Sequence, residues 1–129
     1  MLAVDTNLIV RLLANDDAAQ TRRAAALFAS EQLFISKTVL LESESVLRFS
    51  YELPAKTILQ ALRNIVGLPN VMVEQQREIA EALDGFERGL DFADALHLAG
   101  GRRAGRFATF DKKLIKRAEK LTDIELVLV

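Results

Sequence analysis

The chain starts with Met1-Leu2-Ala3-Val4-Asp5-Thr6-Asn7, a short apolar run followed by residues that favour turns and helix caps. This stretch predicts a buried strand that passes directly into a helix. The helix is supported by apolar residues that recur at helical spacing, namely Leu8, Ile9, Leu12 and Leu13. An Ala-rich segment ending near Ser30 predicts a second helix after the first.

The same alternation continues along the chain. Further short apolar runs predict strands at 33–35, 71–73, 107–110 and 124–129. Amphipathic segments between them predict helices at 38–51, 54–67, 74–88, 91–101 and 112–120. Short strands that are apolar on both faces and separated by helices are typical of a mostly parallel sheet covered on two sides. With no linker, repeat or low-complexity stretch, we expect a single α/β domain over residues 1–129.

Composition narrows the class of protein. The chain has 129 residues, 50% of them hydrophobic, and no cysteine, which excludes a disulfide framework and a thiolate metal site. No apolar run approaches the roughly 20 residues of a membrane helix. The chain start lacks the basic region of a signal peptide, so we expect a soluble cytoplasmic protein without membrane contact.

The charges are nearly balanced but unevenly distributed. The net charge of −1 argues against nucleic acid as a partner unless some acids are neutralised in a metal site. Between Gly101 and Lys120 there are eight basic and two acidic residues, whereas the segment from Glu74 to Asp94 holds seven acids and two bases. The basic portion beside Asp111 could guide a polyanion, although a solvated amphipathic helix explains it equally well.

Four acidic residues suggest a metal site. Asp5 and Asp111 directly follow predicted strands, where ligands bind in open parallel sheets, although each could simply cap the next helix. Glu42 and Asp94 are set among apolar neighbours, an environment that charged side chains occupy when paired or metal-bound. Converging carboxylates need a cation, and oxygen-only ligands select Mg²⁺ or Mn²⁺. Such an ion activates water, which favours phosphodiester hydrolysis.

Several polar residues lie beside these acids, and most of them have two possible roles. Thr6, Asn7 and Thr109 could hold carboxylates in place as a second shell, or Thr6 and Asn7 could act as caps. Asp91 shares a helical face with Asp94 and could support a metal-bound water or serve as an N-cap.

Three more polar residues stand out on predicted helices. His97, the only histidine, could be a general base, but a packing role is favoured. Arg11 could contact a phosphate, a neighbouring carboxylate or only solvent. Glu44 is expected to be a solvated surface residue.

The apolar residues of the helix pair at 38–51 and 54–67 exceed what a small core needs. Some of them are expected to form an exposed patch for a dimer or a partner helix. The residues concerned are Leu40, Val46, Leu47, Phe49, Ile58, Leu59, Leu62 and Ile65.

Four strings, in this order, resemble the motifs of PIN-domain ribonucleases, and most closely those of VapC-type toxins with the related FitB-like branch. They are Ala3-Val4-Asp5-Thr6-Asn7, Val39-Leu40-Leu41-Glu42 with Val46-Leu47, Asp91-Phe92-Ala93-Asp94-Ala95-Leu96-His97, and Ala108-Thr109-Phe110-Asp111. The resemblance covers essentially the whole chain.

The resemblance implies a three-layer α/β/α fold with five parallel strands in the order 3-2-1-4-5. It implies that Asp5, Glu42, Asp94 and Asp111 are the catalytic quartet that binds Mg²⁺ or Mn²⁺ and positions the nucleophilic water. It further implies an endoribonuclease toxin of a type II toxin–antitoxin pair, a homodimer, and inhibition by a VapB-like antitoxin.

Two alternatives belong to other classes. Covalent aspartyl-phosphate chemistry is disfavoured because the second aspartate expected two positions after Asp5 is Asn7. A FitB-like regulatory protein that binds DNA together with an antitoxin, with little nuclease activity, stays open. The complete quartet argues against loss of catalysis without excluding a mainly regulatory role.

Overall fold

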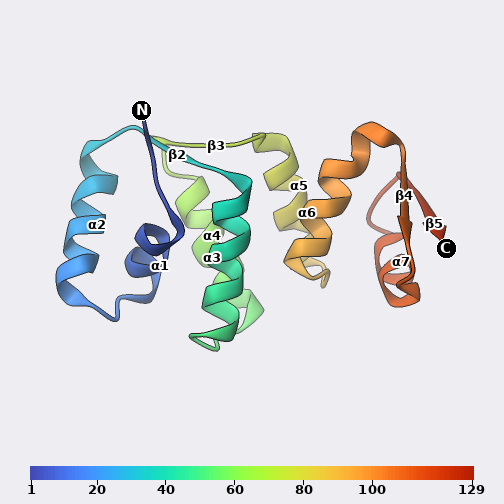
Figure 1. Ribbon diagram of the computed structural model, residues 1–129, viewed down its shortest axis with the longest axis horizontal. Coiled ribbons are helices and arrows are strands. Elements are labelled where there is room, and N and C mark those ends of the chain that lie inside the picture. Colours follow the sequence, from blue (N-terminus) through green and yellow to red (C-terminus); the bar gives the residue numbers. More distant parts are fainter. The chain divides into compact units, whose positions relative to one another are not determined.

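The computed structural model describes residues 1–129, with strands and helices alternating along the chain (Figure 1). The chain divides into two compact units, Met1–Gln76 and Arg77–Val129, called unit 1 and unit 2 below. Every pair of strands is parallel, which confirms the predicted α/β class with a parallel sheet. None of the helices combines the length and apolar character that crossing a membrane requires.

Unit 1 is built on a sheet with the strand order β1-β2-β3. Its strands are β1 (Leu2–Ala3), β2 (Leu33–Ile35) and β3 (Val71–Val73), and its helices are α1 (Thr6–Ala14), α2 (Ala18–Ser30), α3 (Lys37–Phe49) and α4 (Ala55–Val66). Leu33 pairs with Leu2 on one side and with Val71 on the other. Helix α1 packs against α2 and α3, and α3 packs against α4.

The core of unit 1 joins these helices to the central strand. Its fully buried side chains include Ile9, Leu33, Ile35, Leu40, Leu47, Ile58 and Leu62. Burying one such side chain contributes about 1.5–3 kcal/mol, so the alternation of apolar positions explains why the helices pack where they do. Asn15 ends α1 in the left-handed conformation, which asparagine tolerates better than most residues.

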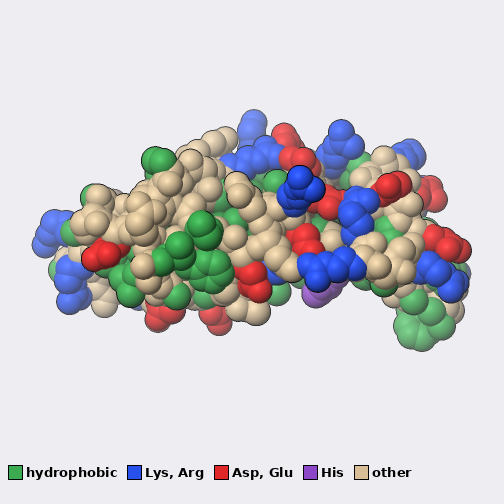
Figure 2. Space-filling model, turned by 90° about the horizontal axis from the view of Figure 1, so that it is seen from above, with side chains coloured by type: hydrophobic (Ala, Val, Ile, Leu, Met, Phe, Trp, Pro, Cys, Tyr) green, Lys and Arg blue, Asp and Glu red, His purple; other side chains and the backbone are tan.

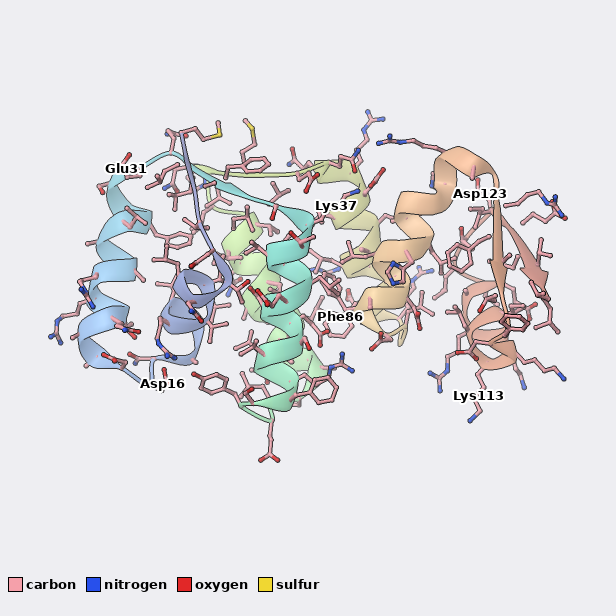
Figure 3. The ribbon with its side chains drawn as sticks, viewed as in Figure 1. Asp16, Glu31, Lys37, Phe86, Lys113 and Asp123 are labelled. Carbon is pink, nitrogen blue, oxygen red and sulfur yellow. The ribbon has the colours of Figure 1, made fainter.

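Unit 2 contains a second parallel sheet, β4-β5. Its elements are α5 (Gln76–Glu87), which starts at the last residue of unit 1, α6 (Phe92–Gly101), the 3₁₀ turn η1 (Arg102–Ala104), β4 (Arg106–Thr109), α7 (Lys112–Ala118) and β5 (Glu125–Leu128). The rings of Phe86 and Phe92 pack 5.4 Å apart between centroids, and Figure 3 labels Phe86. Gly105 adopts a φ of 80° in the turn into β4, a conformation that favours glycine.

The strand orders within the two units, 3-2-1 and 4-5, are compatible with the predicted order 3-2-1-4-5. The pairing of β1 with β4 that this order requires stays a prediction. Strands β2 and β3 have the predicted bounds, and the other elements differ from the predicted ones by a few residues at their ends.

The predicted exposed apolar patch on α3 and α4 is largely wrong. Leu40, Leu47, Ile58, Leu62 and Ile65 are buried in the core of unit 1. Of the remaining predicted residues, Val46 and Leu59 are half-buried, and only Phe49 is largely exposed, at 69%. The reason is that helix α4 packs against both α3 and β3 and so uses its apolar residues within the unit.

Candidate metal centre

Asp5 connects β1 to α1 and caps the helix. Its Oδ1 accepts a hydrogen bond of 3.1 Å from the backbone N–H of Leu8. The capping reading of this residue is therefore confirmed. Capping occupies one carboxylate oxygen, whereas a carboxylate offers about four lone-pair sites, so the cap leaves Asp5 able to bind a cation.

Glu42 lies in α3 and is held by a residue of α1. The hydroxyl of Thr6 donates a hydrogen bond to Oε1 of Glu42. Thr6 is buried, with 8% of its surface exposed, so this donor is fixed by packing. The structure therefore shows the Thr6 hydroxyl bonded to a neighbouring carboxylate, and its role beside a metal ion stays a prediction.

Asp111 repeats the arrangement of Asp5 in unit 2. It is the N-cap of α7, and its Oδ1 accepts hydrogen bonds from the backbone N–H groups of Lys113, at 2.9 Å, and Leu114, at 3.1 Å. The hydroxyl oxygen of Thr109 accepts a hydrogen bond of 3.0 Å from the N–H of Asp111. Thr109 therefore fixes the backbone beside the carboxylate rather than the carboxylate itself.

Asp94 lies in the first turn of α6, in the same unit as Asp111. Burial raises the pKa of its carboxyl, and the negative charges of Asp91 and Asp111 raise it further. His97 acts in the opposite direction through its charge. The structure thus brings Asp91, Asp94 and Asp111 of unit 2 within electrostatic reach of one another.

The remaining predicted polar residues have simpler positions. Asp91 occupies the N-cap position of α6 without a side-chain capping hydrogen bond. Asn7 is exposed and lines a groove of about 440 Å³ between α1 and α2, together with Asp5. His97 is exposed, so the favoured packing role is wrong: its neighbours Leu98 and Ala99 are buried, but the imidazole is not.

The four predicted ligands are thus divided, with Asp5 and Glu42 in unit 1 and Asp94 and Asp111 in unit 2. Within either unit, no three Asp, Glu or His side chains form a group that could hold a metal ion. The convergence of all four stays a prediction. The donor set fits Mg²⁺ or Mn²⁺, because it consists of carboxylate oxygens, and like charges around Asp94 favour a cation.

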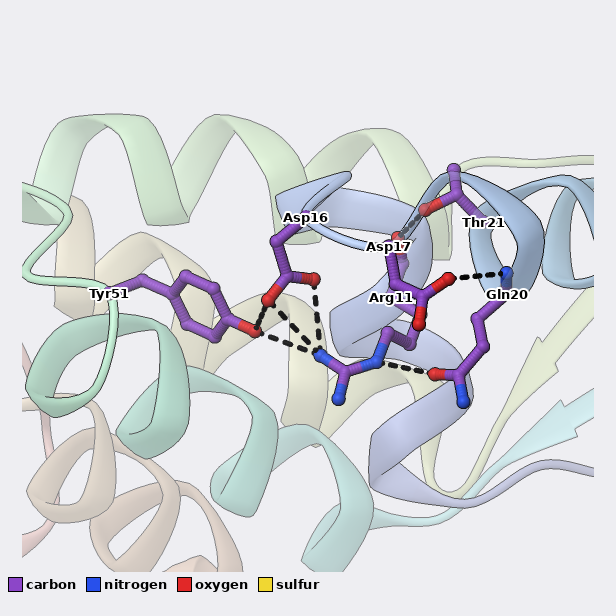
Figure 4. Close-up of polar contacts among 6 residues, drawn as sticks. All are labelled: Arg11, Asp16, Asp17, Gln20, Thr21 and Tyr51. Atoms are coloured by element: carbon purple, nitrogen blue, oxygen red, sulfur yellow. Dashed lines mark hydrogen bonds and ion pairs between the residues drawn. The ribbon is translucent and has the colours of Figure 1, made fainter.

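Arg11 forms hydrogen bonds and an ion pair with other residues of unit 1, near the ends of α1 and α3 (Figure 4). Its guanidinium binds Asp16 at 3.1 Å, the hydroxyl of Tyr51 at 2.9 Å and the side chain of Gln20 at 2.6 Å. The Tyr51 hydroxyl in turn donates to Asp16 at 2.6 Å. Among the readings of Arg11, the contact with a carboxylate is the one observed, and that carboxylate lies outside the predicted quartet.

The expectation that Glu44 is a solvated residue is wrong. Only 1% of its side chain is exposed, and it forms an ion pair of 2.9 Å between its Oε2 and Nε of Arg48. The two residues are spaced i,i+4 on α3, which is the signal that sequence reasoning missed. The guanidinium of Arg48 also stacks over the ring of Phe49, 4.4 Å from its centroid.

Comparisons with known proteins address the family. The model of the PIN domain family matches residues 2–121, which includes parts of both units. A comparison with curated proteins gives no match. The crystal structure of Mycobacterium tuberculosis VapC20, a sarcin-ricin loop cleaving toxin, is similar with a TM-score of 0.47 and 24% identity, over 90% of this chain and 94% of that chain. Because the family model spans nearly the whole chain, the protein belongs to the PIN-domain family.

Proposed function

We propose that this PIN domain is an endoribonuclease toxin of a type II toxin–antitoxin pair, acting in the cytoplasm and dependent on Mg²⁺ or Mn²⁺. Its family membership supports nuclease chemistry, and the four VapC-like strings support the toxin class. The partners in this proposal are RNA as substrate, a VapB-like antitoxin as inhibitor and a second copy of the chain in a homodimer. Since the family model extends across both units, we also propose that residues 1–129 form a single domain.

The match of the PIN family model to residues 2–121 carries the proposal, and the negative charges of Asp91 and Asp111 beside Asp94 support it. A carboxylate with a raised pKa beside two further acids costs folding free energy unless a cation offsets it. In the proposal Asp5, Glu42, Asp94 and Asp111 bind the metal ion. A divalent cation bound by these residues supplies Lewis-acid stabilisation of phosphoryl charge and activation of a water.

The protein residues have separate tasks in this proposal. The backbone N–H groups of α1 and α7 hold Asp5 and Asp111 in fixed orientations, because each carboxylate caps its helix. The Thr6 hydroxyl does the same for Glu42.

The test is to express the full chain without an antitoxin and map cleavage of total cellular RNA with Mg²⁺ or Mn²⁺, with EDTA, and with Asp5→Asn. Asparagine is as good an N-cap as aspartate, so this variant keeps the fold of α1 while losing a charged metal ligand. Cleavage that needs the metal and fails in Asp5→Asn supports the proposal. Equal cleavage in EDTA, or none in a folded protein that co-purifies with a DNA-binding partner, contradicts it, and the second result favours the FitB-like alternative.

A further inference from the structure

The basic residues between Gly101 and Lys120 fall into two groups. The three arginines of the first group are paired with acids of unit 2. Arg102 binds Glu81 and Asp123, which raise the pKa of its guanidinium; Arg103 binds Glu78 at 3.3 Å and Arg106 binds Glu125 at 3.2 Å. The charge of this first group is therefore largely neutralised within unit 2.

The second group, called the α7 cations below, lies on helix α7 and just after it. It consists of Lys112, Lys113, Lys116, Arg117 and Lys120. Within α7 every exposed residue is Lys or Arg, whereas Leu114 and Ala118 are buried. None of the α7 cations forms an ion pair in the structure, although basic and acidic side chains are mixed over the face in Figure 2. Figure 3 shows Lys113 extending from α7 away from the rest of unit 2.

This arrangement works against the stability of the helix. Lys112 and Lys116 are like charges spaced i,i+4, and so are Lys113 and Arg117. Lys112 and Lys113 also occupy the first turn, where the helix dipole disfavours cations. Lys116 and Arg117 lie in the last turn, where the dipole favours cations, but none of the α7 cations is paired with an acid, so a ligand that brings negative charge would reduce their mutual repulsion.

The position of the α7 cations indicates which ligand. They begin directly after Asp111, the N-cap of α7 and a proposed metal ligand. All fully exposed residues of α7 are cations and Ile115 is only half-exposed, whereas the cores of protein–protein interfaces are depleted in charged residues. A nucleic acid backbone, with its regular phosphates, matches such a face better than a protein does.

We propose that the α7 cations bind backbone phosphates of the RNA substrate and direct the strand toward Asp111. This inference rests on the proposed ribonuclease function, which it extends by naming the surface that contacts the substrate. Binding of this kind is independent of base sequence, so it contributes affinity and orientation while the choice of RNA is made elsewhere.

The test measures binding of a fluorescent single-stranded RNA over a salt series, with EDTA and with Asp5→Asn as background so that no cleavage occurs. Lys113→Gln combined with Lys116→Gln is compared with Arg22→Gln combined with Lys56→Gln. The second pair removes the same charge from exposed residues of α2 and α4 in unit 1, which have no ion pair in the structure. Lys113→Arg with Lys116→Arg keeps the charge.

The slope of log affinity against log salt should fall by about 1.4 in the α7 Gln pair, or about 0.7 for each lost phosphate contact. With equal affinities for the variant and the parent at 1 M salt, this difference in slope makes the variant bind roughly 25-fold more weakly than the parent at 0.1 M salt. The Arg22 and Lys56 pair, and the Arg pair on α7, should keep the parental slope.

Equal changes of slope in the two Gln pairs would overturn the inference, because net charge alone would then explain them. An unchanged slope in the α7 Gln pair would overturn it as well, and loss of a co-purifying protein from that variant would then assign α7 to a protein contact. Cleavage by the unmodified chain is scored separately. RNA binding that depends on α7 without any cleavage would leave this inference standing and contradict the proposed function.

Discussion

The two units of this PIN domain differ in how their charged residues are paired. In unit 1 both acids of the candidate site accept a hydrogen bond, Asp5 from the N–H of Leu8 and Glu42 from Thr6. Nearby, Glu44 is paired with Arg48, and Arg11 with Asp16. Unit 2 has such pairs as well, at Arg102, Arg103 and Arg106, but it also holds two groups of like charge. These are the acids around Asp94 and the α7 cations. Paired charges are retained in a fold at little cost, whereas accumulated charges of one sign destabilise it and point to ligands.

The largest effect is expected where like charge accumulates. Asp94→Asn should lower metal-dependent RNA cleavage by more than about 100-fold, the upper range for residues that only support a ligand. It should also remove the rise in the thermal midpoint that Mg²⁺ or Mn²⁺ gives the unmodified chain. A metal at 100 times its Kd stabilises a folded protein by about 2.7 kcal/mol. The control is Asp84→Asn, which removes the charge of an exposed residue of α5. If Mg²⁺ or Mn²⁺ raises the thermal midpoint of Asp94→Asn as much as that of the unmodified chain, the like charges around Asp94 do not mark a metal site.

The next effect tests how unit 1 holds its carboxylate. Thr6→Val removes the hydroxyl that donates to Glu42 while keeping the shape of this buried side chain, so cleavage should fall by about 10- to 100-fold. Thr6→Ser should restore most of the activity. Thr109→Val is the matched change in unit 2, where the hydroxyl contacts only the backbone N–H of Asp111, and a smaller loss is expected. Equal losses in the two valine variants would argue against a special role for Thr6.

A third prediction compares an ion pair in each unit. Arg48→Ala leaves the carboxylate of Glu44 buried without this partner and should reduce the free energy of unfolding by about 1–3 kcal/mol. Arg106→Ala breaks the Arg106–Glu125 pair, whose side chains are 67% and 65% exposed, and should cost at most about 0.5 kcal/mol. Urea unfolding at neutral pH measures both. Similar losses of the free energy of unfolding in the two variants would show that burial does not decide how much each ion pair contributes to stability.

The local structure was largely predictable from sequence because it depends on neighbouring residues. Apolar runs between helix-capping residues located every strand, and Asp5 and Asp111 cap the helices expected from their positions. Family resemblance added the strand order and the ligand roles, which no periodicity encodes. The structure contains the two halves of that order but leaves the β1–β4 pairing and the convergence of the quartet as predictions.

The errors share a physical cause, which is that burial depends on tertiary contacts. Glu44 was expected in solvent because a single glutamate two positions from Glu42 gives no sign of burial, but α3 packs between α1 and α4 and encloses it with Arg48. His97 was expected to pack because its neighbours are apolar, yet it lies on the exposed side of α6. Leu62 and Ile65 were candidates for an external patch and instead complete the core.

The smallest expected effect concerns the polar network of unit 1 at acid pH. The Tyr51 hydroxyl, followed by Arg11, lowers the pKa of the Asp16 carboxyl below its ordinary value. A lowered pKa in the folded state means that the stabilisation is complete above the unfolded pKa, about 4, and is lost as the pH falls through the folded pKa. The difference in thermal midpoint between the unmodified chain and Asp16→Asn should therefore be constant near neutral pH and shrink below about pH 4.

Tyr51→Phe separates the hydroxyl from the rest of this network. It removes the donor that contributes most to the lowered pKa of Asp16 and leaves the ion pair of 3.1 Å between Arg11 and Asp16. The fall of its thermal midpoint with decreasing pH should therefore be intermediate between that of the unmodified chain and that of Asp16→Asn. All three residues are at least partly exposed, so added salt should weaken the stabilisation of ionised Asp16 by the charge of Arg11. The stabilisation by the hydrogen bond from the Tyr51 hydroxyl should remain. The difference in thermal midpoint between the unmodified chain and Asp16→Asn could instead stay constant through the acid range. That result would mean that Asp16 has the same pKa in the folded and unfolded chain, and that its contacts with Tyr51 and Arg11 do not make stability depend on pH.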